Sequence, residues 1–280
     1  MTKIAITGKG GVGKTTLAAL LAYIYAEAGR PVIAIDADPS PSLAYALGMP
    51  EEQIARIAPI AEMEELIYER TGAMPGTGGS FFKLNPRVDD IPDRFSVLHR
   101  GIRLLQLGTI NKGGRGCICP ESVLLKSLVT HLILYRNEVM ILDMDAGVEH
   151  LGRATASNVD AFLIVVEPGQ RSLSTARTIH HLAGDIGVTH CYVVGNKVQD
   201  ETDRDYIRHH LPSDLPIIGF LPLNAQVIEA DRRGQAVFDA VPELLSEAHK
   251  IVTAFNQEKR SVLATFPGLA LCRLDRPTTS

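Results

Sequence analysis

The stretch GKGGVGKTT, residues 8–16, carries the residue types needed to bind nucleotide phosphates. It fits the pattern G-x-x-x-x-G-K-[ST] through Gly8, Gly13, Lys14 and Thr15, between an apolar strand pattern and a helix pattern. Glycines let backbone N–H groups turn toward phosphate oxygens, and a helix N-terminus adds a favourable dipole. We expect Lys14 to contact the β- and γ-phosphates and the Thr15 hydroxyl to bind Mg²⁺. The residues predicted to surround the phosphates are Gly8, Gly10, Gly11, Val12, Gly13, Lys14, Thr15 and Thr16.

Two further stretches place carboxylates at the ends of apolar strand patterns. Asp36 and Asp38 end one strand in IDADPS, and Asp143 ends another in MILDMDAGVEH. Side chains at the carboxyl edge of a parallel sheet are where α/β proteins bind ligands. A carboxylate of the first pair can orient the attacking water, and Asp143 is predicted to hold a water on Mg²⁺. A plainer role for Asp38 is a helix N-cap; we favour catalysis for Asp38 and leave Asp36 as a supporting candidate.

The nucleotide base has candidate contacts later in the chain. Asn196, at the end of a strand pattern in VVGNKVQD, is placed to hydrogen-bond a purine edge. GTPases read guanine with Asn-Lys-x-Asp, whereas here the acid is Asp200, one position too late, which favours adenine. The turn formed by Pro222, Leu223 and Asn224 is a candidate for backbone contacts to the base.

Cys117 and Cys119, in GGRGCICPES, are two of only four cysteines in the chain. In an extended segment their Cα atoms would lie about 6.6 Å apart on one face, which is the outer limit for a disulfide. Two thiolates on one metal need less convergence, but Zn²⁺ generally takes four ligands and thiolates also suit Ni²⁺. The alternative is a pair of small, buried apolar side chains. We favour a metal site completed by another chain across a two-fold axis.

The elements that position these residues alternate along the sequence. Short apolar runs alternate with helical patterns, as in a doubly wound α/β fold with a mostly parallel sheet and helices on both faces. The predicted strands are 3–8, 31–38, 103–108, 138–143, 160–167, 190–196 and 216–222. The predicted helices are 14–28, 51–70, 121–136, 171–187 and 242–257. We expect one phosphate-loop domain over residues 1–257, with a structured insertion at 50–100 and a C-terminal tail at 258–280.

The bulk composition narrows the class of protein. The chain has 280 residues, 45% hydrophobic content and a net charge of −4, which argues against a general nucleic-acid partner. No apolar run is long enough to cross a bilayer, so no membrane partner is expected. The cysteine content does not make a disulfide framework, and we expect a cytoplasmic protein with reduced thiols.

The sequence KGGVGKT resembles the deviant phosphate loop of the nitrogenase iron-protein and septum-site/partition ATPase class. In that class an early lysine, here Lys9, reaches the nucleotide of the other subunit, so the resemblance implies a nucleotide-linked homodimer. It also implies that Asp38 positions the attacking water. A second subunit would supply the two thiolates that one Cys-x-Cys pair lacks.

Five stretches together resemble a narrower family, the nickel-insertion ATPases that mature carbon monoxide dehydrogenase. They are the phosphate loop, IDADPS, KLNPRVDDIPDRF, GRGCICPE and DMDAGVEHLGRA, and the likeness runs to about residue 257. The family implies ATP hydrolysis, with ATP and Mg²⁺ at the phosphate site. It implies a homodimer that binds Ni²⁺, or competing Zn²⁺, through Cys117 and Cys119, with the nickel enzyme as client; the client could also be acetyl-CoA synthase.

Two other functions stay open from the sequence. One is an iron–sulfur electron-transfer ATPase of the nitrogenase iron-protein type. In that type the cysteines that hold the cluster are well separated in the sequence, whereas only a single residue separates Cys117 from Cys119, and Cys191 and Cys272 lie outside the expected regions. The other is a septum- or plasmid-positioning ATPase, although the tail is broken by Pro267 and only weakly basic.

Overall fold

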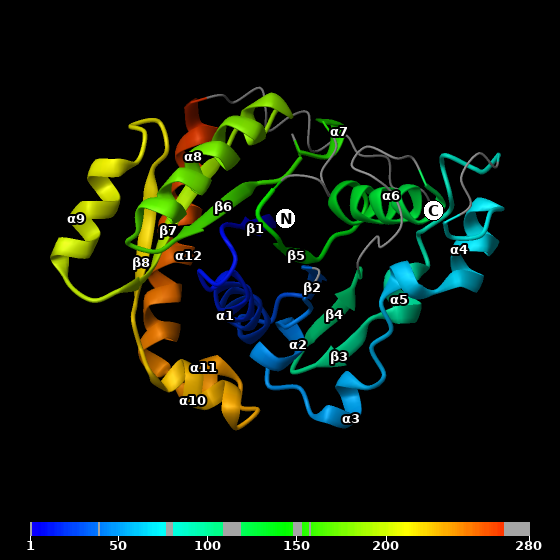
Figure 1. Ribbon diagram of the computed structural model, residues 1–280, viewed down its shortest axis with the longest axis horizontal. Helices are drawn as coiled ribbons and strands as arrows, with labels where there is room; N and C mark the ends of the chain where they lie inside the picture. The colour runs from blue at the N-terminus through cyan, green and yellow to red at the C-terminus, as the bar shows by residue number, and fades with distance from the viewer. Residues whose placement is uncertain are drawn as a thin grey trace.

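The computed structural model describes residues 2–38, 40–76, 81–108, 119–147, 153–156 and 158–265. Its centre is an eight-stranded sheet, parallel except at one edge (Figure 1). In spatial order the strands are β3 (Val97–His99), β4 (Ile102–Gln106), β2 (Val32–Ala37), β5 (Val139–Met144), β1 (Lys3–Thr7), β6 (Ala161–Val166), β7 (Cys191–Val198) and β8 (Ile217–Pro222). The predicted doubly wound α/β fold is confirmed.

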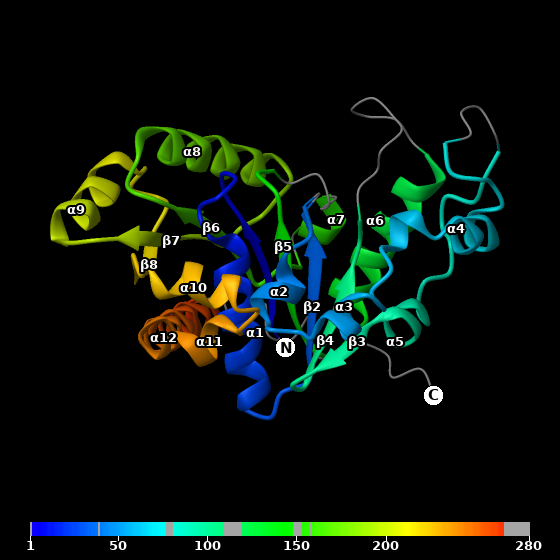
Figure 2. The ribbon, with the colours of Figure 1, turned by 60° about the horizontal axis from the view of Figure 1, so that its bottom comes forward.

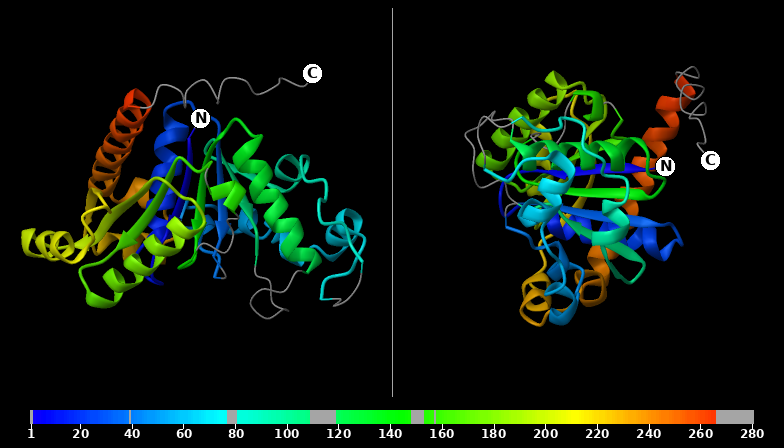
Figure 3. Two further views of the ribbon diagram at one scale, coloured as in Figure 1. Left: turned by 90° about the horizontal axis from the view of Figure 1, so that it is seen from above. Right: turned by 90° about the vertical axis from the view of Figure 1, so that its right-hand side faces the viewer.

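Helices cover both faces of this sheet because its central strands are apolar on both sides. In β1, Ile4 and Ile6 pack into one apolar cluster and Ala5 packs into the other. The first cluster contains α1 (Lys14–Glu27) and α12 (Pro242–Thr265), which lie side by side in Figure 3. The second cluster contains α6 (Pro120–Leu134) and α8 (Gln170–Asp185). Figure 2 shows α8 and α12 on opposite faces of the β7–β8 half of the sheet.

Shorter helices join these main elements. They are α2 (Leu43–Ala46), α3 (Glu51–Ile54), the 3₁₀ turn η1 (Ile60–Glu62), α4 (Glu64–Thr71), α5 (Ile91–Phe95), α7 (Arg153–Ala156), α9 (Glu201–His210), α10 (Gln226–Arg232) and α11 (Val237–Ala240). No helix in these described ranges combines the length and apolar character needed to cross a membrane.

Three features of the fold differ from the prediction. The helix predicted at 51–70 is broken into α3, η1 and α4, with Pro59 in an extended conformation before η1. The insertion at 50–100 also contributes the antiparallel edge strand β3, which was not predicted. The last helix, predicted to end at 257, continues as α12 to Thr265 and so enters the predicted tail.

Candidate nucleotide site

The phosphate loop leads from the carboxyl end of β1 into the first turn of α1, as predicted. Gly13 is the N-cap of α1 and has a left-handed backbone, with φ +94°. A Cβ on Gly8 would lie 2.4 Å from the carbonyl oxygen of Val165, and one on Gly13 would lie 2.1 Å from Nδ2 of Asn196. A larger residue at Gly8 would displace the backbone of β6, and one at Gly13 would displace the side chain of Asn196 on β7.

Lys14 lies between two carboxylates at the edge of the sheet. Its side chain is only 5% exposed, and its Nζ lies 3.6 Å from Oδ2 of Asp38 and 3.9 Å from Oδ1 of Asp145. Both distances exceed those of a direct hydrogen bond, so neither acid holds the lysine tightly. Asp145 was not among the predicted site residues, because nothing in its spacing shows that it approaches Lys14.

Asp36, the penultimate residue of β2, and Asp38, which follows that strand, have different surroundings. Asp36 is buried, and its carboxylate accepts hydrogen bonds from the backbone N–H groups of Asp38 (3.2 Å), Ser42 (2.9 Å) and Leu43 (2.9 Å). Burial raises the pKa of Asp36, and these N–H groups act in the opposite direction. Asp36 therefore shapes the turn into α2. Asp38 accepts from Ser40 N–H at 2.9 Å and also faces Lys14, so its predicted role in orienting water stays a prediction.

Asp143, at the end of β5, is the most constrained acid of the site. It is fully buried, and within the described part of the chain neither of its oxygens has a hydrogen-bond partner of ordinary geometry. Burial raises its pKa to about 7, and the nearby Thr15 hydroxyl lowers it without making a well-formed bond to it. Mg²⁺ prefers oxygen ligands, so a buried carboxylate that accepts no hydrogen bonds and lies beside a hydroxyl fits this ion. Thr15 and Asp143 thus lie together as the predicted metal side of the site.

Asn196 lies against the phosphate loop rather than in open space. Its Nδ2 donates to the carbonyl oxygen of Val12 at 2.7 Å, and its Oδ1 accepts from the N–H of Lys197 at 2.8 Å. Its predicted contact with adenine therefore stays a prediction. In the turn after β8, the side chain of Asn224 accepts from Gln226 N–H at 2.8 Å and so begins α10.

A hollow of about 250 Å³ adjoins Thr15 and Thr16, and it was not predicted. The short helices α2 and α10 form its walls, and its lining is mainly apolar. Tyr45 from α2 and Ile228 from α10 contribute exposed apolar surface there. The sequence signal was weak, because the lining residues come from segments that lie far apart in the chain.

Lys9 is bound within its own chain. Its Nζ lies 3.7 Å from Oε1 of Glu167, the residue that follows β6, and its side chain is 36% exposed. Glu167 was not among the predicted site residues. Its contact with Lys9 depends on β6 lying next to β1, which the sequence spacing does not reveal.

Of the predicted metal-binding pair, only Cys119 lies within the described residues; Cys117 lies outside them. Cys119 is 7% exposed, has an extended backbone, and directly precedes α6. Among the residues that the structure describes, no three His, Cys, Asp or Glu side chains gather as a metal site. The shared Cys-x-Cys site therefore stays a prediction.

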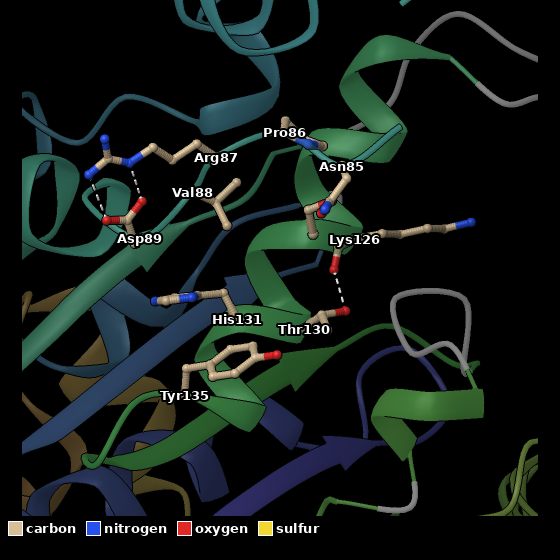
Figure 4. A pocket seen from close by; sticks show the side chains of 10 residues that line it. Asn85, Pro86, Arg87, Val88, Asp89, Lys126, Thr130, His131 and Tyr135 are labelled. Atoms are coloured by element: carbon tan, nitrogen blue, oxygen red, sulfur yellow. Dashed lines mark hydrogen bonds and ion pairs between the residues drawn. The ribbon is translucent and has the colours of Figure 1, made fainter. Parts of the chain in front are cut away.

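A larger hollow, of about 420 Å³, lies apart from the phosphate loop between residues 85–89 and α6 (Figure 4). Arg87 and Asp89 form an ion pair on one wall, and His131 of α6 and Tyr135, which directly follows that helix, form the other. None of the predicted site residues lines it. Residues 85–89 belong to KLNPRVDDIPDRF, one of the five stretches on which the resemblance to the narrower family is based. Part of that stretch therefore lines this hollow.

The fold and site define a class of protein that comparison with known families confirms. Residues 3–237 match the family model of the CobQ/CobB/MinD/ParA nucleotide-binding domain, and the chain belongs to this family. Solved structures agree in fold: a putative plasmid partition protein from Borrelia burgdorferi bound to AMPPNP aligns with a TM-score of 0.65 over 92% of this chain and 100% of that one, at 14% identity. The MinC:MinD cell division complex from Aquifex aeolicus gives 0.63 over 90% and 96%, at 22% identity.

Within the family, the sequence is similar to a carbon monoxide dehydrogenase accessory protein, CooC, from Rhodospirillum rubrum. The two are 44% identical over 252 residues, which is 90% of this chain and 95% of that protein. An uncharacterised ATP-binding protein from Methanocaldococcus jannaschii is 47% identical over 237 residues, 84% of this chain and 90% of that one. The resemblance predicted from the sequence is thereby confirmed.

Proposed function

We propose that this protein is a dimeric ATPase of carbon monoxide dehydrogenase maturation that binds Ni²⁺ through Cys117 and Cys119 and assists its insertion into the enzyme. The observation that carries the ATPase part is the convergence of Lys14, Asp38 and buried Asp143 at one sheet edge. The client is inferred from the similarity to CooC, whose name records that accessory role. Nickel is the cargo, and the Cys-x-Cys spacing supports its binding.

Hydrolysis would use the residues as follows. Lys14 exchanges its two carboxylate neighbours for the β- and γ-phosphates of ATP, and Asp38, released from Lys14, orients a water toward the γ-phosphorus. Attack by this water breaks the bond between that phosphorus and the β–γ bridging oxygen, giving ADP and phosphate. Thr15 and Asp143 would hold Mg²⁺, which when bound spreads the charge of the transferring phosphoryl group.

Dimerisation would connect the nucleotide to the metal. Lys9 would leave Glu167 to reach the nucleotide of the second subunit, so the two chains approach when ATP is bound. A two-fold axis near the start of α6 would bring two thiolates from each chain into one four-thiolate site. Opening of that site after hydrolysis would release nickel to the client in the cytoplasm.

The test is a double variant, Cys117→Ser with Cys119→Ser, compared with Cys191→Ser. Cys191 is partly buried, and burial raises the pKa of its thiol to about 12, so it is a poor metal ligand and a matched control. By equilibrium dialysis with MgATP, we expect the double variant to lose tight Ni²⁺ binding while the control keeps it. Equal nickel affinity in the double variant and the wild type would exclude the proposed site.

A further inference from the structure

We propose that Lys197 is a positioning residue of the nucleotide site, which holds the phosphate loop in its binding shape from strand β7. This inference rests on the proposed nucleotide site and adds a residue to it. The Nζ of Lys197 donates to the carbonyl oxygen of Gly11 at 2.6 Å. The adjacent Asn196 donates to the carbonyl oxygen of Val12 at 2.7 Å. Two consecutive carbonyls of the loop are thus held by two consecutive residues of β7.

These contacts decide which way the loop's N–H groups point. A trans peptide is planar and carries its C=O and N–H on opposite sides. Because the oxygen of Val12 is held against Asn196, the N–H of Gly13 points away from β7. The peptide whose oxygen Lys197 holds carries the N–H of Val12, which donates to the carbonyl oxygen of Lys9 at 3.3 Å and so closes the turn of the loop. A phosphate-binding loop needs such outward N–H groups and must keep its carbonyl oxygens away from the anion. Lys197 and Asn196 hold the carbonyl side, so they favour the binding shape before nucleotide arrives.

The backbone of β7 is distorted where it presents Lys197 to the loop. The pairing of β7 with β8 shifts register between Gly195 and Val198, and bulges of this kind redirect side chains. Lys197 has φ +57°, a left-handed conformation that is unfavourable for residues other than glycine and asparagine. The hydrogen bond from its N–H to the side chain of Asn196 accompanies this conformation. A strained lysine at a distorted strand end is typical of a functional contact.

Glu167 supplies the counter-charge for Lys197. Its Oε2 lies 3.3 Å from the Nζ of Lys197, while its Oε1 faces Lys9 at 3.7 Å. Glu167 follows β6, the strand between β1 and β7, so it can reach lysines on both sides. The pair is partly exposed and contributes little to stability by itself. Its effect is to orient the Lys197 ammonium toward Gly11.

The experiment measures binding of a non-hydrolysable ATP analogue with Mg²⁺, by calorimetry, for Lys197→Met and Lys197→Arg. Lys250→Met, at an exposed lysine of α12 that pairs with Glu247, is the control. We expect Lys197→Met to weaken binding about tenfold, as for loss of a charged hydrogen bond. ATPase assays should show the same rise in KM with kcat changed less, while Lys197→Arg recovers most of the affinity and the control matches the wild type.

A Lys197→Met variant that binds the analogue within about twofold of the wild type would overturn the proposal. A parallel loss of kcat and of thermal stability, without rescue by arginine, would also overturn it, because that pattern indicates a purely structural lysine. The binding assay needs neither hydrolysis nor nickel. If the wild type binds the analogue but neither hydrolyses ATP nor binds nickel, the proposed function fails. The affinities of the Lys197 variants for the analogue would still decide this inference.

Discussion

The ammonium group of Lys14 lies 3.6 Å from a carboxylate oxygen of Asp38. Without nucleotide, the charge of this buried lysine is therefore balanced by Asp38 and, at 3.9 Å, by Asp145. Phosphates would replace these acids as partners of Lys14, which leaves Asp38 beside the γ-phosphate. Under the proposed function, nucleotide binding and assembly of the hydrolytic site would thus be one exchange of the ion pairs of Lys14.

Removing the Asp38 carboxylate should separate binding from hydrolysis. We expect Asp38→Asn to lower kcat at least about a hundredfold, the usual contribution of a positioned acid or base, because Asp38 is the residue proposed to orient the water. ATP affinity should stay equal or rise, since Lys14 loses a competing partner. Phosphate release and calorimetry measure the two quantities, with exposed Asp214→Asn as the control. A variant that retains wild-type kcat would remove Asp38 from the mechanism.

Asp143 should make the metal-free protein less stable as the pH rises. Burial raises its folded pKa to about 7, whereas an unfolded aspartate has its pKa near 4. Between these values the unfolded chain releases the proton first, so the free energy of unfolding falls with increasing pH. The fall should be on the order of 2–4 kcal/mol across this range.

The Asp143→Asn variant tests this directly. We expect it to be at least as stable as the wild type at pH 8 and to show a flatter pH profile, while losing Mg²⁺-dependent ATP turnover. Urea unfolding at pH 5 and pH 8, without metal or nucleotide, provides the comparison. Identical pH profiles for the two proteins would mean that Asp143 does not titrate as its burial indicates.

Gly13 and Gly29 form a matched pair for testing the loop geometry. Both have left-handed backbones, with φ +94° and +71°, but only at Gly13 would a Cβ collide, with Asn196 at 2.1 Å. We expect Gly29→Ala to cost about 1 kcal/mol of stability and to bind nucleotide normally. Gly13→Ala should cost more and lose nucleotide binding, as measured by thermal unfolding and calorimetry. Normal nucleotide binding by Gly13→Ala would show that the loop tolerates this displacement.

Site residues that a local motif marks could be predicted from the sequence, whereas contacts that depend on the order of the strands in the sheet could not. The phosphate loop, Asp38 and Asp143 were identified because a motif or an apolar strand end marks each one. The contacts of Lys197 with Gly11 and of Lys9 with Glu167 were missed, because they depend on the order β1-β6-β7 and on a bulge. Strand β3 was missed because it has three residues, all partly or fully exposed, and pairs antiparallel at the edge.

The hydrogen bonds of Asp36 show the same limit on a smaller scale. The same strand pattern in the sequence marks Asp36 and Asp38, yet Asp36 accepts three backbone N–H groups whereas Asp38 accepts one, from Ser40. Asp38 faces Lys14 instead. The alternation of side chains along a strand does not decide this, because Asp36 lies within β2 whereas Asp38 lies beyond its end, where the chain turns.

The most direct test of the central claim is a Ni²⁺ titration of the full chain with and without MgATP, with molecular mass measured by light scattering at each point. The proposed function predicts a dimer with MgATP and one tightly bound Ni²⁺ per two chains, and loss of both stoichiometry and tight binding in the Cys117→Ser, Cys119→Ser variant. A protein that stays monomeric with MgATP and Ni²⁺, or that binds nickel equally well without these cysteines, would contradict it.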